Sequence, residues 1–235
     1  MTRRRIWIAA ALLALVLVIT TLPMRLALGM AGAADAGLSA RAVTGSIWSG
    51  QLVDARWRGA RLGTLGAGLA PLALLGGDAR LNIARDDILL GKLDGALILN
   101  GARGVADLNG TVSLGASLAG VPLDAIRLEG VSARFDDSGR CVAAAGRVQL
   151  RVALPGLDLA NGLSGPLACR GGRAEAVLAS QSGMERLTLA IDGAGQYRAR
   201  LAVRSNGDAA IAGLLRAVGF LPAGEELVLL HEGRL

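Results

Sequence analysis

The side chains that enzymes use for catalysis are sparse in this chain, and their spacing builds no reactive group. His231 is the single histidine and lies close to the C-terminal end. The stretch Gly45–Gly50 contains two serines but does not match the Gly-x-Ser-x-Gly pattern of a nucleophile elbow. Asp86 and Asp87 are an adjacent acidic pair of the kind usually solvated in a turn. With one histidine and no CxxC, a metal site is not expected either. We therefore predict no catalytic residue, metal or cofactor, and a protein that is not an enzyme.

The residues that best suit binding are aromatic and basic. Arg56, Arg58 and Arg61 lie close to Trp57, and Trp48 precedes them. One interpretation is a polar strand face turned toward water. The other is a docking surface for an acidic partner or for lipid headgroups. We carry these five residues forward as candidate partner contacts.

The N-terminal residues predict export of the rest of the chain. Three arginines, Arg3 to Arg5, precede residues 6–22, which carry no charged side chain. As a helix this run would be about 25 Å long, the short end of what spans a bilayer. The arginine cluster should stay cytoplasmic. A cleaved signal peptide is the alternative, but its apolar core normally runs only about 7–15 residues. Both interpretations export the remainder of the chain.

The net charge of +6 does not indicate a nucleic-acid partner. Arg3, Arg4, Arg5 and Arg25 flank the apolar run, and without these four the charge falls to +2. The basic excess is therefore mainly a topology signal, and we expect no nucleic acid among the partners.

Cys141 and Cys169 are the two cysteines, and both lie in the part predicted to be exported. An even pair in an oxidising compartment is most simply a disulfide. Two buried free thiols are the alternative.

Alternation of apolar and polar residues dominates after about residue 45. Leu187, Leu189 and Ile191 alternate with polar or small residues, as do Val148 and Leu150. This period of two predicts strands with one face on a core. Strand-like runs recur with glycine at most breaks, which predicts a meandering antiparallel sheet. The segment Gly193–Gly195 should be a hairpin turn, and the phase of the alternation shifts at Gly130 and near Gly50, which fits bulges.

One helix outside the N-terminal run is predicted. Ile211, Leu214, Leu215 and Val218 form an apolar stripe at helical spacing, with Asn206 or Asp208 as N-cap and Gly219 at the end. The fold class is therefore mainly β: one N-terminal transmembrane helix, a periplasmic meandering antiparallel sheet and a short C-terminal helix. We divide the chain into a basic cytoplasmic tail with a signal anchor (1–25), a linker (26–44) and a periplasmic β-rich domain (45–235).

Four short segments carry a resemblance to a known family. They are Thr44–Gln51, with its small residue, hydrophobic residue, Trp, x, Gly pattern, Leu69–Gly77, Leu163–Cys169 and Gly193–Tyr197. Together with the placement of both cysteines, they resemble the type II secretion system protein N family of Gram-negative bacteria. The resemblance implies a single-pass inner-membrane protein with a periplasmic body, an accessory part of the machine that moves folded proteins across the outer membrane. A more distant likeness is to AsmA-type periplasmic proteins, which are tied to envelope lipid traffic.

These observations lead to one main hypothesis and two alternatives. The main one is a scaffold that contacts other subunits of the type II secretion machine and is anchored in the inner membrane through residues 6–22. The second is an AsmA-like lipid-handling protein with an apolar groove on a curved sheet. The third is a secreted enzyme, against which the missing catalytic residues count.

Overall fold

The computed structural model describes residues 7–8, 10, 17, 20–35, 37–58, 60–118, 121–152 and 162–234. Most of residues 6–22, the predicted membrane anchor, lies outside this part. Among the described residues, no helix has the length and apolar character needed to cross a bilayer. The transmembrane helix therefore stays a prediction.

The described chain forms a 15-stranded antiparallel sheet with three short helices. The first eight strands are β1 (Leu38–Ser39), β2 (Ala42–Ser46), β3 (Ser49–Trp57), β4 (Ala60–Leu69), β5 (Arg80–Asp87), β6 (Gly91–Ile98), β7 (Arg103–Leu118) and β8 (Val121–Phe135). The others are β9 (Cys141–Val152), β10 (Leu163–Arg170), β11 (Arg173–Ala179), β12 (Glu185–Ile191), β13 (Gln196–Arg204), β14 (Leu221–Ala223) and β15 (Glu226–Arg234). The helices are α2 (Met24–Met30), α3 (Pro71–Leu75) and α4 (Ala209–Ala217).

The strands follow one another as a meander, which confirms the predicted antiparallel sheet. From β3 to β13 each strand pairs with the next along the chain, and β15 then pairs with β13. The alternation of side chains explains the register, because Leu187 lies opposite Leu201 and both are buried, whereas Arg186 lies opposite Ala202 on the other face. Residues Gly193–Gly195 form the predicted turn between β12 and β13.

One predicted bulge is confirmed and the other is displaced. Gly130 has a φ of 57°, and the pairing of β8 with β9 shifts register at this point. Near Gly50 the chain reverses in a tight hairpin instead, between β2 and β3. The bulge of β3 falls at Asp54, which has a φ of 49°, and it turns both Leu52 and Ala55 toward the core. A bulge breaks the period of two, so alternation alone mislocated the buried face.

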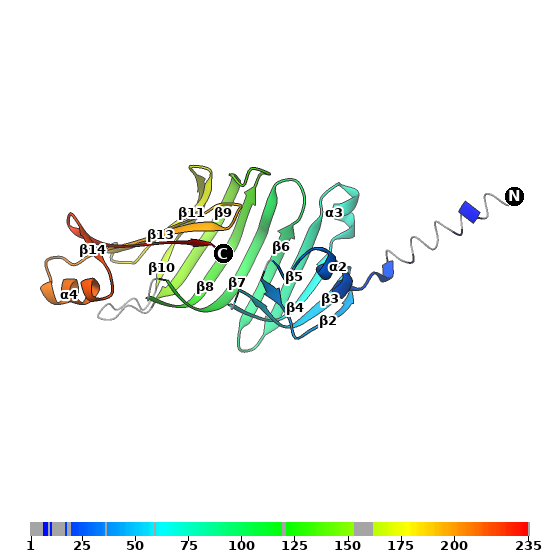
Figure 1. Ribbon diagram of the computed structural model, residues 1–235, viewed down its shortest axis with the longest axis horizontal. Coiled ribbons are helices and arrows are strands. Elements are labelled where there is room, and N and C mark those ends of the chain that lie inside the picture. Colours follow the sequence, from blue (N-terminus) through cyan, green and yellow to red (C-terminus); the bar gives the residue numbers. More distant parts are fainter. Residues whose placement is uncertain are drawn as a thin grey trace.

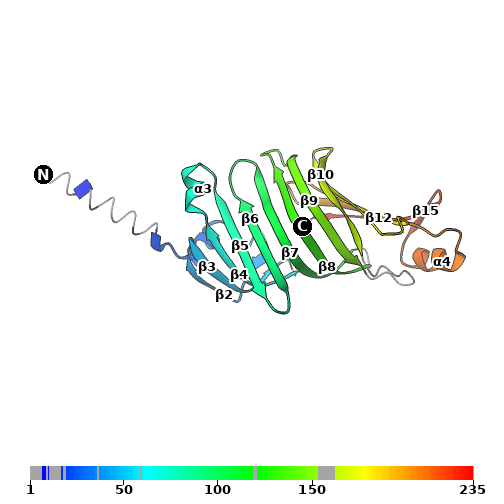
Figure 2. The ribbon, with the colours of Figure 1, turned by 180° about the vertical axis from the view of Figure 1, so that it is seen from behind.

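The sheet is rolled, as Figures 1 and 2 show. The end of β4 pairs with β5, through Gly66–Leu69. The start of β4 also pairs with β7, through Arg61 and Ser113. Further along, the Gly193 N–H donates to the Gly139 carbonyl at 2.9 Å, which joins the β12–β13 turn to the β8–β9 turn. Contacts between non-adjacent hairpins require strong curvature, and the concave face encloses the larger core.

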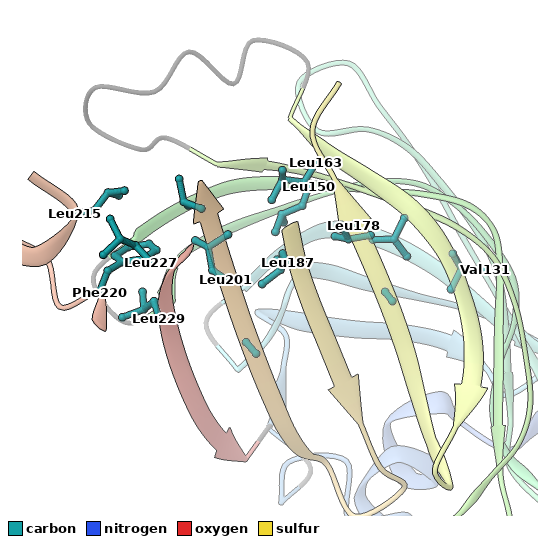
Figure 3. Packing of buried hydrophobic residues seen from close by; sticks show 14 residues of the cluster. Val131, Leu150, Leu163, Leu178, Leu187, Leu201, Leu215, Phe220, Leu227 and Leu229 are labelled. Atoms are coloured by element: carbon teal, nitrogen blue, oxygen red, sulfur yellow. The ribbon is translucent and has the colours of Figure 1, made fainter. Parts of the chain in front are cut away.

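That core fills the C-terminal half of the roll (Figure 3). Its buried apolar side chains come from β8 to β13, from β15 and from the segment around α4. Phe220, Leu163, Leu178 and Val203 are the largest fully buried side chains. The chain has few aromatic residues, so branched aliphatic side chains supply most of the buried surface.

Helix α4 forms where predicted, but its buried face differs. Asp208 is the N-cap, and its carboxylate accepts from the N–H groups of Ala210 and Ile211. Leu215 is 2% exposed and packs in the core, whereas Leu214 is 52% exposed and Val218 is also exposed. Only one edge of the predicted stripe therefore docks, because the helix lies at the end of the roll and meets the sheet along its Ile211–Leu215 side (Figure 1).

A second core lies under α2 at the opposite end of the sheet. Met24 is buried against Leu52, Ala55 and Leu65, and Pro23 forms an isolated bridge with Ser46. Residues 26–44, which the sequence suggested were a linker, contain most of α2, all of β1 and the start of β2. These elements are short and show little periodicity, so the sequence pattern did not predict them.

Candidate functional site

The five candidate contact residues do not form one site. Trp48 lies in the turn before β3, and Trp57 is the last residue of that strand. Nine residues of extended chain separate the two by roughly 30 Å. Trp48 therefore lies where β3 begins. Arg56, Trp57, Arg58 and Arg61 lie where β3 ends and β4 begins.

The arginines at the second end extend into a longer row. Arg56 pairs directly with Arg61 across β3 and β4, and both side chains are exposed. Arg61 pairs with Ser113, Ser113 with Ala125, and Ala125 with Arg151. Cross-strand partners project from the same face, so Arg151 joins this row. Within the described residues, Arg56, Arg61 and Arg151 make no salt bridge.

The arginine row is an exposed, positively charged surface. Two positive charges on directly opposite residues, as at Arg56 and Arg61, repel each other and slightly destabilise the sheet. Carboxylates close to such a pair normally offset this repulsion. Guanidinium groups bind carboxylates or phosphates through paired hydrogen bonds. Sequence reasoning missed Arg151 because the β4–β7 pairing that aligns it with Arg61 has no local signal.

Arg85 is a buried charged residue that the sequence analysis also missed. It is 4% exposed, and its guanidinium donates to the carbonyls of Leu62 at 2.8 Å, Leu90 at 2.8 Å, Gly91 at 3.0 Å and Thr111. Burial lowers the pKa of this group, and the carboxylate of Asp87 opposes that effect. The side chain ties β4, the β5–β6 turn and β7 together, and thereby holds the strand pairing on which the arginine row depends.

A shallow groove of about 520 Å³ lies at the Trp48 end. Its floor is made of small residues, Gly66, Gly68 and Ala84, which alternate along their strands with residues that face the core. Trp48 forms one wall and Pro71–Leu72 of α3 the other. A Cβ at Gly68 would collide with the carbonyl of Trp48, so glycine permits the turn to lie against β4.

This groove unites two of the segments that carry the family resemblance. Thr44–Gln51 contributes Trp48, and Leu69–Gly77 contributes the start of α3. The Leu69 N–H donates to the Ile47 carbonyl at 2.8 Å, which fixes the two segments side by side. The groove is largely apolar, and it suits a hydrophobic contact.

The predicted disulfide is present, in the C-terminal half of the sheet. The Sγ atoms of Cys141 and Cys169 are 2.03 Å apart and their Cα atoms 5.6 Å apart. The bridge joins β9 to β10 beyond their last ladder pair, and the Cys141 N–H donates to the Gly172 carbonyl at 2.7 Å. Leu163–Cys169 and Gly193–Tyr197, the other two resemblance segments, both lie in this half of the sheet.

Two aspartates at turns have lowered pKa values because they accept several hydrogen bonds. Hydrogen bonds from the Ser138 hydroxyl and the Arg140 N–H lower the pKa of Asp136 in the β8–β9 turn. The N–H groups of Leu90 and Leu89 likewise lower the pKa of Asp87. In the part of the chain that the structure describes, no three histidine, cysteine or acidic residues gather as a metal site.

Comparison with protein families adds the decisive observation. The model of the family described as type II secretion system (T2SS), protein N, matches residues 36–227. The chain belongs to this family. No curated protein and no solved structure matches it. The match to the protein N family includes the groove, Arg56, Arg61 and Arg151, and both cysteines. Membership supports a role in type II secretion and an envelope location.

Proposed function

We propose that this protein N family member is an accessory inner-membrane component of the type II secretion system that acts by binding. Its periplasmic body would contact other subunits of the machine as a scaffold. The observation that carries the proposal is the family match over residues 36–227. The described surfaces support it, because they offer an apolar groove and an arginine row.

The proposed topology follows the sequence. Residues 1–25 would be the cytoplasmic tail and single-pass anchor, with the body in the periplasm. The Cys141–Cys169 disulfide supports this placement, since such bonds persist in oxidising compartments. An anchor also raises the effective concentration of the body near its partners, so modest contacts can suffice.

Gene deletion tests the secretion role. We expect loss of the protein to reduce release of type II substrates and leave them active inside the cells. The intact gene should restore release, and a variant carrying Arg56→Glu and Arg61→Glu should restore it only partly. A deletion strain with normal release, measured with a broad set of substrates, would contradict the proposal.

An AsmA-like lipid-handling role is the alternative, and the apolar groove of about 520 Å³ favours it. A pocket of this size lies within the range used for small ligands. Purified protein should then yield bound lipid on solvent extraction, and a deletion strain should change its envelope lipids while secretion stays normal.

A further inference from the structure

The end of the sheet that carries α2 and α3 has exposed apolar side chains without a described partner surface. Leu72 is 82% exposed and Leu75 is 86% exposed on α3. Leu26 and Met30 are exposed on α2, one helical turn apart, while Met24 faces the core. Figure 1 shows both helices at the same end of the molecule. Large aliphatic side chains gathered on two short helices indicate an interaction surface.

The connection to the N-terminal run is direct. The Ile47 N–H donates to the Leu22 carbonyl at 3.0 Å, and the Leu69 N–H donates to the Ile47 carbonyl at 2.8 Å. Helix α3 begins two residues after Leu69. The last residue of the uncharged run 6–22 therefore lies within about two strand spacings, roughly 10 Å, of the chain that leads into α3.

We propose that this end of the body, with Leu26, Met30, Leu72 and Leu75 in contact, lies against the bilayer that holds residues 6–22. The inference rests on the proposed anchor and adds a second, peripheral membrane contact. Lipid is the occupant that the connectivity favours, because a chain leaving a bilayer at Leu22 keeps α2 and α3 at its surface. Exposed Arg25, which directly precedes Leu26, suits the phosphate groups of the interface.

The test labels one position at a time in the full-length protein. Both native cysteines are in the disulfide, so Leu75→Cys adds one free thiol for an environment-sensitive fluorophore. Leu221→Cys is the matched control, because Leu221 is also an exposed leucine but lies in β14, at the opposite end of the molecule (Figure 1). Both variants are reconstituted in vesicles of phosphatidylethanolamine and phosphatidylglycerol.

We expect nitroxide-labelled headgroups to quench the label at position 75, and aqueous iodide to quench it several-fold less than the label at position 221. Adding Leu72→Glu should make position 75 more accessible to iodide. Equal iodide quenching at both positions, in protein that stays with the vesicles after alkaline washing, would overturn the contact while leaving the anchor intact. Release of the protein from the vesicles by alkaline washing would overturn both the peripheral contact and the anchor. Protection seen only in native membranes would mean that another protein covers this end, and the lipid contact would be wrong.

Discussion

Replacing Arg85 with methionine should strongly destabilise the N-terminal half of the sheet. The guanidinium donates to four backbone carbonyls, from Leu62, Leu90, Gly91 and Thr111. Hydrogen bonds to charged groups contribute about 1.5–3 kcal/mol each. Desolvation of the buried charge offsets several kcal/mol of that sum, so the net loss should be about 3–5 kcal/mol. Methionine fills a similar volume, so the loss of stability would come mainly from the four carbonyl groups left without a hydrogen-bond donor.

Urea unfolding of the detergent-solubilised, oxidised protein measures this loss through the fluorescence of Trp48 and Trp57. Arg80→Met is the matched control, since Arg80 lies on the same strand and its 3.6 Å ion pair with Asp107 is partly exposed, at 37% for the arginine and 71% for the aspartate. That variant should stay within about 1 kcal/mol of the original protein. Arg85→Lys should fall between the two, because an ammonium group has three donors but cannot match the planar fork. If Arg85→Met and Arg80→Met unfold at the same urea concentration, the carbonyl network does not stabilise the sheet.

Three further results are expected. Leu215→Asp should cost about 4 kcal/mol or more in urea unfolding, because it buries a charge, whereas Leu214→Asp should be nearly neutral; equal effects would mean that α4 docks differently. Replacing Cys141 and Cys169 with serine should lower stability by about 3–4 kcal/mol, given a sequence separation of 28 residues, and reductant should then have no further effect. The lowered pKa of Asp136 contributes stability above its unfolded value near 3.8 that is lost as pH falls through its lower native pKa, so Asp136→Asn should flatten the acid limb of a stability-versus-pH curve.

The local features of the fold were accessible from sequence because short-range patterns encode them. Alternating residues predicted strands that the structure confirms, such as β12 and β13, in which Leu187 lies opposite Leu201. The Asp208 cap follows from the same kind of local chemistry. An even cysteine pair predicted the disulfide without any geometry.

Features that depend on distant strands were not accessible. The sequence places Trp48 close to Trp57, but the extended strand β3 separates them. It places Arg61 and Arg151 ninety residues apart, but the pairing of β4 with β7 aligns them. Arg85 follows Leu81 and Ile83 at a spacing of two, so the alternation of β5 places it on the core face. The carbonyl groups that accept its hydrogen bonds come from three backbone segments, and their convergence is a long-range property without a local sequence signal.

The glycines around the Trp48 turn explain how two separate family segments form one surface. At Gly68 the carbonyl of Trp48 occupies the space where a side chain would be, and at Gly50 the side chain of Met24 does so from the other face. The same short stretch of sheet therefore accepts the β2–β3 turn on one side and α2 on the other. A larger residue at either position would push away one of the two elements that flank the N-terminal run. The small residues of these segments thus allow α2 and the β2–β3 turn to pack on the same stretch of sheet.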